Sequence, residues 1–371
     1  MPDSQLFTPV KIGNVQLQHR IVMAPLTRYR ADDSHVHSPF ATEYYSQRAA
    51  IPGTLLITEA TFISPQAGGY ANVPGIYNDS QIKAWKGVTE AVHAKGSFIF
   101  MQLWALGRAA TPEVLKSELG SAAKLVSSSN VPMSKDDVAP EALSEEDIWK
   151  FVGYYRQAAL NAIEAGFDGV EIHGANGYLV DQFTQDTANK RTDQWGGSVE
   201  KRARFALEVA KAVVEAVGAK RTAIRLSPYS KFQGMRMDDP KPGFSYLASQ
   251  LKKLNLAYIH IVQPRIAGDS TVEATDKIDF LIDIWGKASP IFIAGGYLPN
   301  TAYEAVEDYP DQDICIVFGR YFISNPDLVF RVKKGIELTP YERPKFYNAK
   351  ERDGYTNYPF SKEFLANGLE L

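Results

Sequence analysis

Short apolar runs recur along the whole chain, and most of them are followed by a segment with helical spacing. The runs contain many β-branched residues and are bounded by Gly, Pro or polar residues, a pattern typical of parallel strands that are buried on both faces. They lie at residues 21–24, 55–58, 98–101, 170–172, 223–226, 258–262, 291–294 and 314–318. The pattern therefore predicts eight buried strands.

The segments between these runs repeat apolar residues at helical spacing. The clearest covers residues 144–164, where we expect Ser144 and Asp147 to form a capping pair. One face of this helix carries Ile148, Val152, Tyr155, Ala159 and Ile163. Eight strand–helix units in succession, with no linker between them, predict an α/β fold of the (β/α)8 type, a TIM barrel, that forms a single domain over residues 1–371.

Two additions to the barrel are visible in the pattern. Residues 10–17 alternate between apolar and polar positions around Gly13 and Asn14, which predicts a β-hairpin that caps the N-terminal end of the barrel. After the third strand, residues from about 107 to 143 are rich in Ser, Ala, Lys and Pro. Because so long a connection is uncommon in a compact domain, we expect a lid or a long excursion loop there.

Composition and charge narrow the class of protein. Hydrophobic residues make up 45% of the 371 residues and charged residues 22%, which is ordinary for a globular protein with a sizeable core. Forty Lys and Arg residues against 43 Asp and Glu residues give a net charge of -3, without a long basic or acidic block. We therefore expect no nucleic acid and no membrane among its partners.

The single cysteine and the ends of the chain bear on location. Cys315 lies in an apolar run and cannot form an internal disulfide, so it suits a reducing compartment and a place in the core. Residues 1–5 lack the pattern of a signal peptide, and residues 369–371 form no recognisable address. No apolar run approaches the roughly 20 residues of a membrane span. We expect a soluble, cytoplasmic protein.

Hydrogen-bonding residues and glycines follow most of the predicted strands, where the reactive groups of this fold lie. Packing alone does not account for such residues at so many successive strand ends, so the pattern predicts a functional site. These residues are Pro25 and Thr27, Glu59 and Ala60, Gln102 and Trp104, His173, Asn176 and Tyr178, Arg225, Gly295 and Gly296, and Gly319 and Arg320.

The end of the fourth strand carries the motif HGANGY at residues 173–178. One interpretation is a turn whose glycines relieve crowding. The other is a site in which His173 and Asn176 grip a carbonyl oxygen and Tyr178 supplies a proton. The polar residues at the other strand ends favour the second interpretation.

Two glycine turns follow the seventh and eighth strands, where this fold commonly binds phosphate through backbone N–H groups. They are Gly295-Gly296 and Gly319-Arg320. Two tight turns with a surface charge are the plainer alternative.

Gln102, Thr27 and Arg225 suggest what the phosphate is attached to. The Gln amide matches the carbonyl and N–H edge of a heterocycle, and the fixed charge of Arg225 suits a cofactor that becomes anionic on reduction. Flavin mononucleotide (FMN) meets each requirement. The alternative for Arg225 is a salt bridge inside the barrel with a carboxylate of a neighbouring strand.

In these motifs the chain resembles the old yellow enzyme family of FMN-dependent ene-reductases, over nearly its full length. The matching segments follow one another in the family's order. They are residues 24–28 (APLTR), 58–60 (TEA), 64–70 (SPQAGGY), 102–104 (QLW), 173–178 (HGANGY), 181–183 (DQF), 191–197 (RTDQWGG), 225–228 (RLSP) and 319–320 (GR).

The resemblance implies how cofactor and substrate are held. His173 and Asn176 would donate hydrogen bonds to the carbonyl oxygen of an enone, enal or similar substrate. Tyr178 would protonate the α-carbon while hydride passes from reduced flavin N5 to the β-carbon, with NADPH (or NADH) as the reductant. The FMN-binding residues would be Pro25, Thr27, Ala60, Gln102, His173 and Arg225, with Gly295, Gly296, Gly319 and Arg320 at the phosphate. Trp104, Tyr70, Phe346 and Tyr347 would line the substrate pocket, together with the three donors.

Four positions distinguish branches of the family. Thr27 stands where one branch has Cys, which places the chain in the Thr-bearing classical branch. Ala60 stands where some members have Gly, and Gly296 stands where some members have Asn. Tyr178 favours reduction, because relatives with Phe there can isomerise an aldehyde of an alkaloid pathway.

Two rival functions stay open at this point. A dehydrogenase or oxidase on another FMN barrel would need a base, whereas residues 173–178 offer donors. A flavin-binding protein without turnover is the rival from another class. His93 and His260 show no partner pattern and are expected at the surface or in the core, and no spacing matches a metal site. We expect a small-molecule partner and a monomer or homodimer.

Overall fold

The computed structural model describes residues 4–268, 270–273 and 275–368. Eight parallel strands close into a barrel, in which β15 pairs with β3 and β4 pairs with β6. The predicted (β/α)8 TIM barrel is therefore confirmed. The barrel strands are β3 (Ile21–Met23), β4 (Leu55–Ile57), β6 (Phe98–Trp104), β9 (Gly169–Gly174), β10 (Thr222–Leu226), β11 (Tyr258–Val262), β14 (Ile291–Ala294) and β15 (Ile314–Phe318).

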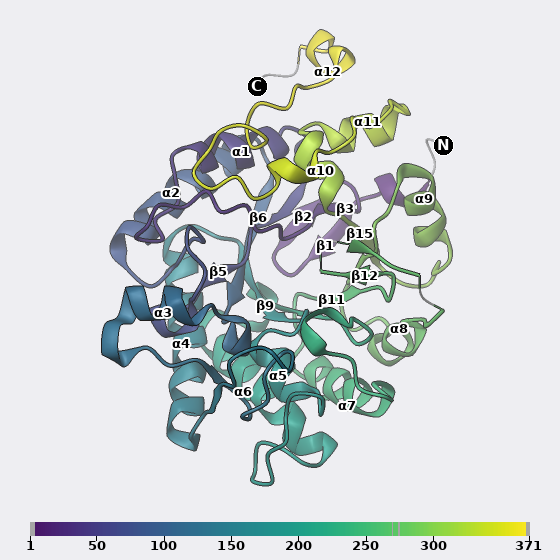
Figure 1. Cartoon of the computed structure of the whole chain (residues 1–371). Coiled ribbons are helices and arrows are strands. Elements are labelled where there is room, and N and C mark those ends of the chain that lie inside the picture. The colour runs from purple at the N-terminus through teal and green to yellow at the C-terminus, as the bar shows by residue number, and fades with distance from the viewer. Residues whose placement is uncertain (1–3, 269, 274, 369–371) are drawn as a thin grey trace.

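A helix follows each barrel strand and packs on the outside of the barrel (Figure 1). These helices are α1 (Phe40–Arg48), α2 (Asp79–Ala94), α4 (Glu145–Glu164), α6 (Val199–Val217), α7 (Lys241–Lys252), α8 (Asp279–Trp285), α9 (Pro299–Glu307) and α11 (Leu328–Lys334). The connections add the short helices α3 (Pro112–Leu119), α5 (Leu179–Thr184) and α10 (Arg320–Ser324) and the short strands β5 (Thr61–Phe62), β12 (Ile266–Ala267) and β13 (Ser270–Thr271), and the C-terminal segment after α11 adds α12 (Lys362–Ala366).

Helix α4 begins where the capping pair was predicted. The Ser144 hydroxyl accepts a hydrogen bond from the Asp147 backbone N–H at 3.1 Å and donates one to the Asp147 carboxylate at 2.8 Å. An N-cap of this kind satisfies one of the N–H groups that the first turn leaves unpaired. Of the predicted apolar face, Ile163 is half-buried, and the remaining residues are buried.

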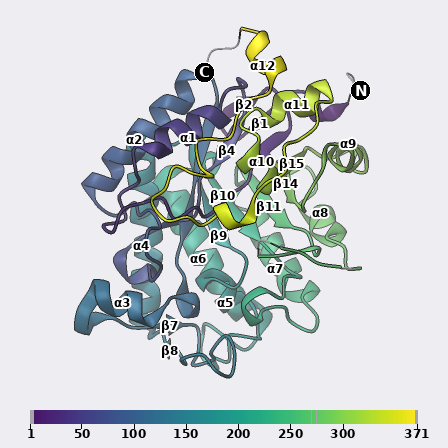
Figure 2. The ribbon, with the colours of Figure 1, turned by 45° about the horizontal axis from the view of Figure 1, so that its top comes forward.

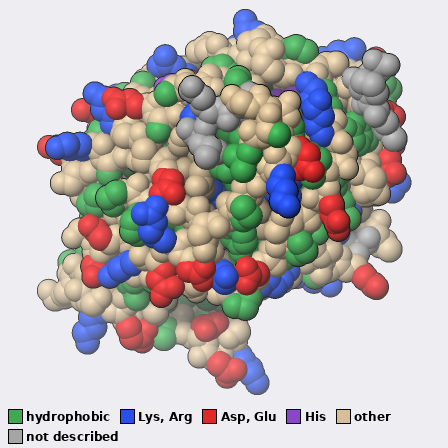
Figure 3. Space-filling view, turned by 90° about the horizontal axis from the view of Figure 1, so that it is seen from above, with side chains coloured by type: hydrophobic (Ala, Val, Ile, Leu, Met, Phe, Trp, Pro, Cys, Tyr) green, Lys and Arg blue, Asp and Glu red, His purple; other side chains and the backbone are tan. Residues whose placement is uncertain are grey.

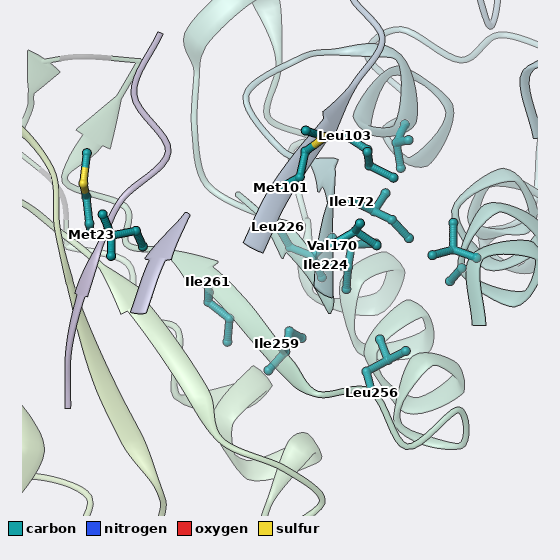
Figure 4. Packing of buried hydrophobic residues seen from close by; sticks show 14 of the residues in the cluster. Met23, Met101, Leu103, Val170, Ile172, Ile224, Leu226, Leu256, Ile259 and Ile261 are labelled. Carbon is teal, nitrogen blue, oxygen red and sulfur yellow. The ribbon is translucent and has the colours of Figure 1, made fainter. Parts of the chain in front are cut away.

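Two apolar layers hold the barrel. The outer layer packs the outward-facing strand residues, among them Val170, Ile224 and Ile259, against the helices (Figure 4). The inner layer fills the barrel and contains Phe100 and Cys315. Because apolar residues alternate between these layers along each strand, both faces of the sheet are buried.

The predicted hairpin closes the bottom of the inner layer. Strands β1 (Val10–Ile12) and β2 (Val15–Leu17) pair antiparallel, and their buried side chains belong to the same cluster as the barrel interior. Gly13 lies at φ +54° in the turn, a conformation that glycine adopts without strain. The hairpin therefore acts as the predicted N-terminal cap.

The long connection after the third barrel strand carries structure of its own. It contains α3 and two short strands, β7 (Val126–Ser127) and β8 (Glu141–Ala142), which pair in parallel. Leu115 of α3 packs into a cluster with Trp104 and Leu106. The connection is thus an excursion, packed against the outside of the barrel mouth.

The C-terminal segment returns to the barrel mouth and lies beside α1 and α10 (Figures 1 and 2). The guanidinium groups of Arg28, Arg30 and Arg48 donate hydrogen bonds to backbone carbonyls of this segment, including those of Phe346 and Tyr355. All three arginines are buried. Their donors satisfy carbonyls of irregular backbone that no sheet or helix pairs.

Charges of both signs are interspersed on the face seen in Figure 3. Among the described residues, no helix is long and apolar enough to cross a membrane. Residues 1–3 and 369–371, on which part of the expectation about targeting depends, lie outside the described residues.

Candidate active site

A cavity of about 460 Å³ opens at the carboxyl ends of the barrel strands. Every residue predicted to bind cofactor or substrate lines it, although the residues come from seven strand ends and the C-terminal segment. Glu59 is the exception among the polar strand-end residues, because its carboxylate is buried and bonded to His37 and to the Arg28 backbone N–H. The predicted residues at the cavity are Pro25, Thr27, Ala60, Tyr70, Gln102, Trp104, His173, Asn176, Tyr178, Arg225, Gly295, Gly296, Gly319, Arg320, Phe346 and Tyr347.

The register of the barrel strands places three basic side chains, those of His173, Arg225 and His260, next to one another. Arg225 on β10 is aligned with His173 on β9 and with His260 on β11. Gln102 on β6 is aligned with Glu171 on β9. Since aligned residues of neighbouring parallel strands share a face, these residues form two adjacent layers inside the barrel. His173, Arg225 and Gln102 line the cavity, and Glu171 and His260 lie behind them.

His173 is a neutral donor in this arrangement. Burial, aided by the nearby Arg225 charge, holds the pKa of His173 well below its usual value of 6.5. The Ala175 backbone N–H donates to His173 Nδ1 at 3.4 Å. Nδ1 is therefore the acceptor, which leaves the proton on Nε2.

Asn176 is held by its backbone. It lies at φ +57°, and its N–H donates to Ser227 Oγ at 2.7 Å. Its side-chain Oδ1 is buried and has no hydrogen-bond partner among the described residues. A buried amide oxygen without a partner is costly, so this oxygen suits a hydrogen-bond donor of a ligand, and the NH2 group of the same amide can donate to an acceptor.

Tyr178 is protonated over the whole physiological range. Burial raises its pKa well above 10, and the neighbouring Tyr70 and Tyr29 add to the effect. Its ring makes an edge contact with His173, with centroids 4.9 Å apart. A phenol of this kind keeps its proton at neutral pH and has the chemistry of a proton donor.

Two residues of α5 hold the peptide groups of Gly177. The Asp181 carboxylate accepts the Gly177 N–H at 2.9 Å, and Gln182 Nε2 donates to the Gly177 carbonyl at 2.7 Å. Gly177 lies at φ +77°, where a Cβ atom would come within 2.7 Å of the Met235 side chain. Asp181 and Gln182 therefore fix the loop that carries Asn176 and Tyr178.

The floor of the cavity carries an acceptor and donors side by side. Gln102 Nε2 donates to Glu171 at 2.7 Å, so Gln102 Oε1 is the amide atom left for the cavity. Arg225 Nε donates to His260 at 3.4 Å, and its two terminal nitrogens make no hydrogen bond to any residue that the structure describes. Glu171 is the carboxylate of a neighbouring strand that the alternative for Arg225 required, but His260 stands between them.

The histidines outside the motif have partners that sequence reasoning missed. His260 is buried and 2.9 Å from Glu171, and His93 is 2.9 Å from Asp168 at the surface. No spacing along the chain announces either pair, because the partners are 89 and 75 residues apart.

On the phosphate side, Gly295 and Gly296 leave room where a side chain would collide with neighbours. A Cβ on Gly295 would lie 2.4 Å from Gln263 Oε1, and Gly296 lies at φ +64°. Arg320, which follows Gly319, donates to Thr271 Oγ1 at 2.8 Å and stacks on Tyr341. Bare backbone beside a guanidinium is the arrangement that phosphate groups favour.

Aromatic rings form the opposite wall. Tyr70 meets Trp104 with ring centroids 5.8 Å apart, and Trp104 meets Tyr178 at 4.8 Å. Tyr29 lies between Tyr70 and Tyr347, at 6.4 and 5.5 Å. Sequence reasoning missed Tyr29, whose only signal was its place two residues after Thr27 at a strand end.

The excursion after the third strand does not reach the cavity. None of residues 107–143, all of which the structure describes, lines it. Phe232, Ile266 and Gly268, from the connections after β10 and β11, line it instead. Of the two expectations for residues 107–143, a lid or an excursion loop, the structure therefore shows the excursion, and the later connections and the C-terminal segment shape the cavity instead.

Comparison with known proteins agrees with the barrel fold and identifies its family. Residues 5–339 match the NADH:flavin oxidoreductase / NADH oxidase family. The structure of Old Yellow Enzyme from Pichia sp. AKU4542 superimposes with a TM-score of 0.89 at 42% identity, covering 98% of this chain and 95% of that one.

Two relatives carry names that differ on whether the protein is an active enzyme. Chanoclavine-I aldehyde reductase fgaOx3 of Penicillium roqueforti is 61% identical, over 97% of this chain and 98% of that protein. The probable inactive dehydrogenase easA of Claviceps purpurea is 48% identical, over 98% and 97%. Because the family match, the fold and these identities all span nearly the whole chain, the protein belongs to the old yellow enzyme family of flavin-linked oxidoreductases.

Proposed function

We propose that this protein is an FMN-dependent reductase of activated C=C bonds, with NADPH or NADH as the reductant. Its substrates are α,β-unsaturated aldehydes and ketones and related nitroalkenes. The observation that carries the proposal is the set of three hydrogen-bond donors at the cavity: the neutral imidazole of His173, the amide of Asn176 and the protonated phenol of Tyr178. The reduction needs donors, whereas the oxidation of 2-hydroxy acids needs a base.

The cavity suits FMN. Gln102 Oε1 and the Arg225 terminal nitrogens offer an acceptor beside donors, which matches the N–H and carbonyl edge of the flavin ring. Gly295, Gly296 and Arg320 suit the phosphate, and Pro25, Thr27, Ala60 and Gly319 complete the wall on this side. Bound FMN supplies hydride for the substrate.

The residues of the chain bind and activate the carbonyl. His173 Nε2–H and the Asn176 amide donate to the substrate oxygen, which gains negative charge when the β-carbon accepts hydride. Donors that are already in place stabilise this charge without reorganisation. Their positions depend on Ser227 and on the α5 residues that hold Gly177.

Tyr178 delivers the proton to the α-carbon. Burial keeps its phenol protonated, and its edge contact with Trp104 fixes the ring. A positioned acid of this kind contributes about 10²- to 10⁴-fold to a rate.

The aromatic wall narrows the substrate class. Tyr29, Tyr70, Trp104, Tyr347 and Phe346 offer flat apolar surface, which favours substrates that carry an aromatic or polycyclic ring system. The relative that is 61% identical is a chanoclavine-I aldehyde reductase. We therefore propose that an unsaturated aldehyde of this kind is a substrate, and that Tyr178 directs it to reduction rather than isomerisation.

We also propose a role for Thr27, a role for Cys315, and the location and oligomeric state of the protein. Thr27 places the chain in the Thr-bearing branch, and its hydroxyl, which lines the cavity, would help to hold FMN and adjust its reduction potential. Cys315 is buried, and burial raises its thiol pKa to about 12, so it serves in the core as predicted. The protein works in the cytoplasm as a monomer or homodimer, without a metal.

A flavin-binding role without turnover is the second candidate. The observation that favours it is the 48% identity to a probable inactive dehydrogenase. The complete donor set argues for turnover.

An anaerobic titration tests the proposal. NADPH is added to the purified protein while its visible spectrum is followed, and 2-cyclohexenone or an aromatic enal is added next. We expect the flavin absorption to bleach and then to recover. A yellow protein that bleaches without recovery on any enone or enal would support the second candidate. A colourless protein that takes up no FMN would overturn both.

A further inference from the structure

A carboxylate lies below the cavity, at the centre of a closed hydrogen-bond network. Glu171 is fully buried, and its Oε1 accepts from Gln102 Nε2 at 2.7 Å. Its Oε2 accepts from His260 Nδ1 at 2.9 Å and from the Tyr258 hydroxyl at 3.0 Å. Ala223, aligned between Glu171 and Tyr258, is small enough to let the phenol reach across.

Arg225 determines which atoms of this network donate hydrogen bonds and which accept them. A guanidinium nitrogen can only donate, so the contact between Arg225 Nε and His260 Nε2 makes Nε2 an acceptor. The proton of His260 must then lie on Nδ1, where it is donated to Glu171. Burial also lowers the pKa of His260 below its usual value, so the imidazole is neutral.

Glu171 keeps its negative charge in spite of its burial. Burial by itself raises a carboxyl pKa, but His260, Arg225 and Gln102 more than offset it and hold the pKa of Glu171 below the usual value. This network therefore holds one positive charge, on Arg225, and one negative charge, on Glu171, joined through the neutral imidazole of His260. An isolated buried charge of either sign would be far more costly.

The same carboxylate decides which way the Gln102 amide points. A carboxylate oxygen only accepts, so the Gln102 NH2 group must face Glu171 and the Gln102 oxygen must face the cavity. With the amide reversed, two oxygens would meet inside a dry barrel. Glu171 thus determines that the cavity floor offers an acceptor at Gln102, next to the donors of Arg225.

We propose that Glu171 is a positioning residue for the flavin: through Gln102 and His260 it sets the acceptor-and-donor pattern, and through its charge it balances Arg225. The inference rests on the proposed function, because it names what the floor of that same cavity recognises. Glu171 itself does not line the cavity, so it acts only through these neighbours.

Recognition is tested with FMN and its N3-methyl analogue, which lacks the ring N–H. Dissociation constants are measured by quenching of flavin fluorescence in apoprotein. We expect the wild type to bind FMN at least about tenfold more tightly than the analogue, because one hydrogen bond to a buried acceptor is lost. In Glu171→Gln the Gln102 amide can turn, and the ratio is expected to fall toward one.

The effect of the Glu171 charge is tested by measuring the two-electron midpoint potential of bound FMN. Glu171→Gln leaves Arg225 unbalanced, so we expect the affinity for reduced over oxidised FMN to rise about tenfold, equivalent to about 30 mV. Glu171→Asp keeps the charge and shortens the reach. In this variant we expect FMN and its N3-methyl analogue to bind about equally well, while the midpoint potential stays near that of the wild type. Glu171→Asp therefore replaces Glu171→Gln as the test variant if Glu171→Gln does not fold.

Asp168→Asn is the matched control, because it also breaks a carboxylate–histidine contact of 2.9 Å, outside the cavity. It is expected to change neither readout. Equal discrimination and equal potential in the wild type and in a folded Glu171 variant would overturn the positioning role. A wild type that binds no FMN would overturn the proposed function itself, so the two failures are distinguishable.

Discussion

Arg28 Nε donates a hydrogen bond to the Phe346 carbonyl oxygen at 3.0 Å, across 318 residues of sequence. Arg28 follows the first barrel strand, and Phe346 belongs to the C-terminal segment that closes the cavity wall. The same guanidinium donates to Tyr44 Oη at 3.1 Å and to the Gly354 carbonyl at 2.5 Å. One buried side chain therefore joins the barrel, α1 and the cavity wall to which Phe346 belongs.

Arg28→Lys is expected to loosen this wall. A lysine has no fork of donors and leaves at least one buried carbonyl unpaired, so the free energy of unfolding falls by roughly 2–5 kcal/mol. The KM for an aromatic enal is expected to rise severalfold while FMN stays bound. Denaturant unfolding and steady-state kinetics measure both. Arg352→Lys, which alters an exposed ion pair with Glu43, is the control, and an equal effect there would refute the role of Arg28.

Asp181 makes stability depend on pH. Burial is the main cause that raises its pKa to about 7 in the folded protein, against about 3.9 in an unfolded chain. The native state therefore binds the extra proton between these values, and its contribution to stability is full below about pH 4 and lost as the pH rises through 7. From pH 5 to 8 the free energy of unfolding is expected to fall by about 3 kcal/mol more in the wild type than in Asp181→Asn.

Chemical denaturation at several pH values measures this difference. Asp186→Asn makes the same change at an exposed position five residues later, and it is expected to keep the wild-type pH dependence. Parallel curves for the wild type and Asp181→Asn would show that Asp181 does not titrate in this range.

Tyr178→Phe is expected to slow enone reduction by about 10²- to 10⁴-fold and to leave NADPH oxidation nearly unchanged, because only the proton donor is lost. Stopped-flow spectroscopy separates the two half-reactions. Tyr70→Phe removes a hydroxyl from a facing ring of the same cavity and is expected to change the rate less than about threefold. Equal loss in both half-reactions would rule out the acid role of Tyr178.

His173→Ala and Asn176→Ala are each expected to weaken binding of a para-substituted phenol by about tenfold or more. A phenolate mimics the substrate oxygen as it gains charge, and hydrogen bonds to a charged group are worth about 1.5–3 kcal/mol. Titration of the flavin spectrum with the phenol gives the dissociation constants. Unchanged affinity in either variant would remove that residue from the carbonyl site.

The enone half-reaction is expected to show no inflection between about pH 6.5 and 9. The pKa of His173 lies well below 6.5 and that of Tyr178 well above 10, because both are buried. Both donors therefore keep their protons throughout this window. A clear inflection near pH 7 that persists in Asp181→Asn would contradict one of these two assignments.

Prediction from the sequence succeeded where local pattern carries the information. All eight barrel strands, the hairpin and the start of α4 were predicted, because burial of strand faces and capping depend on neighbours in sequence. The strand-end residues that line the cavity could be named from the sequence for the same reason. Tyr29, Phe232 and Ile266 were missed, since their place at the cavity depends on how loops fold over the barrel.

By itself, the sequence determined the alternation that makes a barrel, the donors at residues 173–178 and the family motifs that contain them. Only the tertiary structure decided that Glu171 meets Gln102 and His260, and that Phe346 is held by Arg28. These contacts join residues from 69 to 318 positions apart. Strand register and loop closure set them, and no local pattern of hydrophobic and polar positions records either.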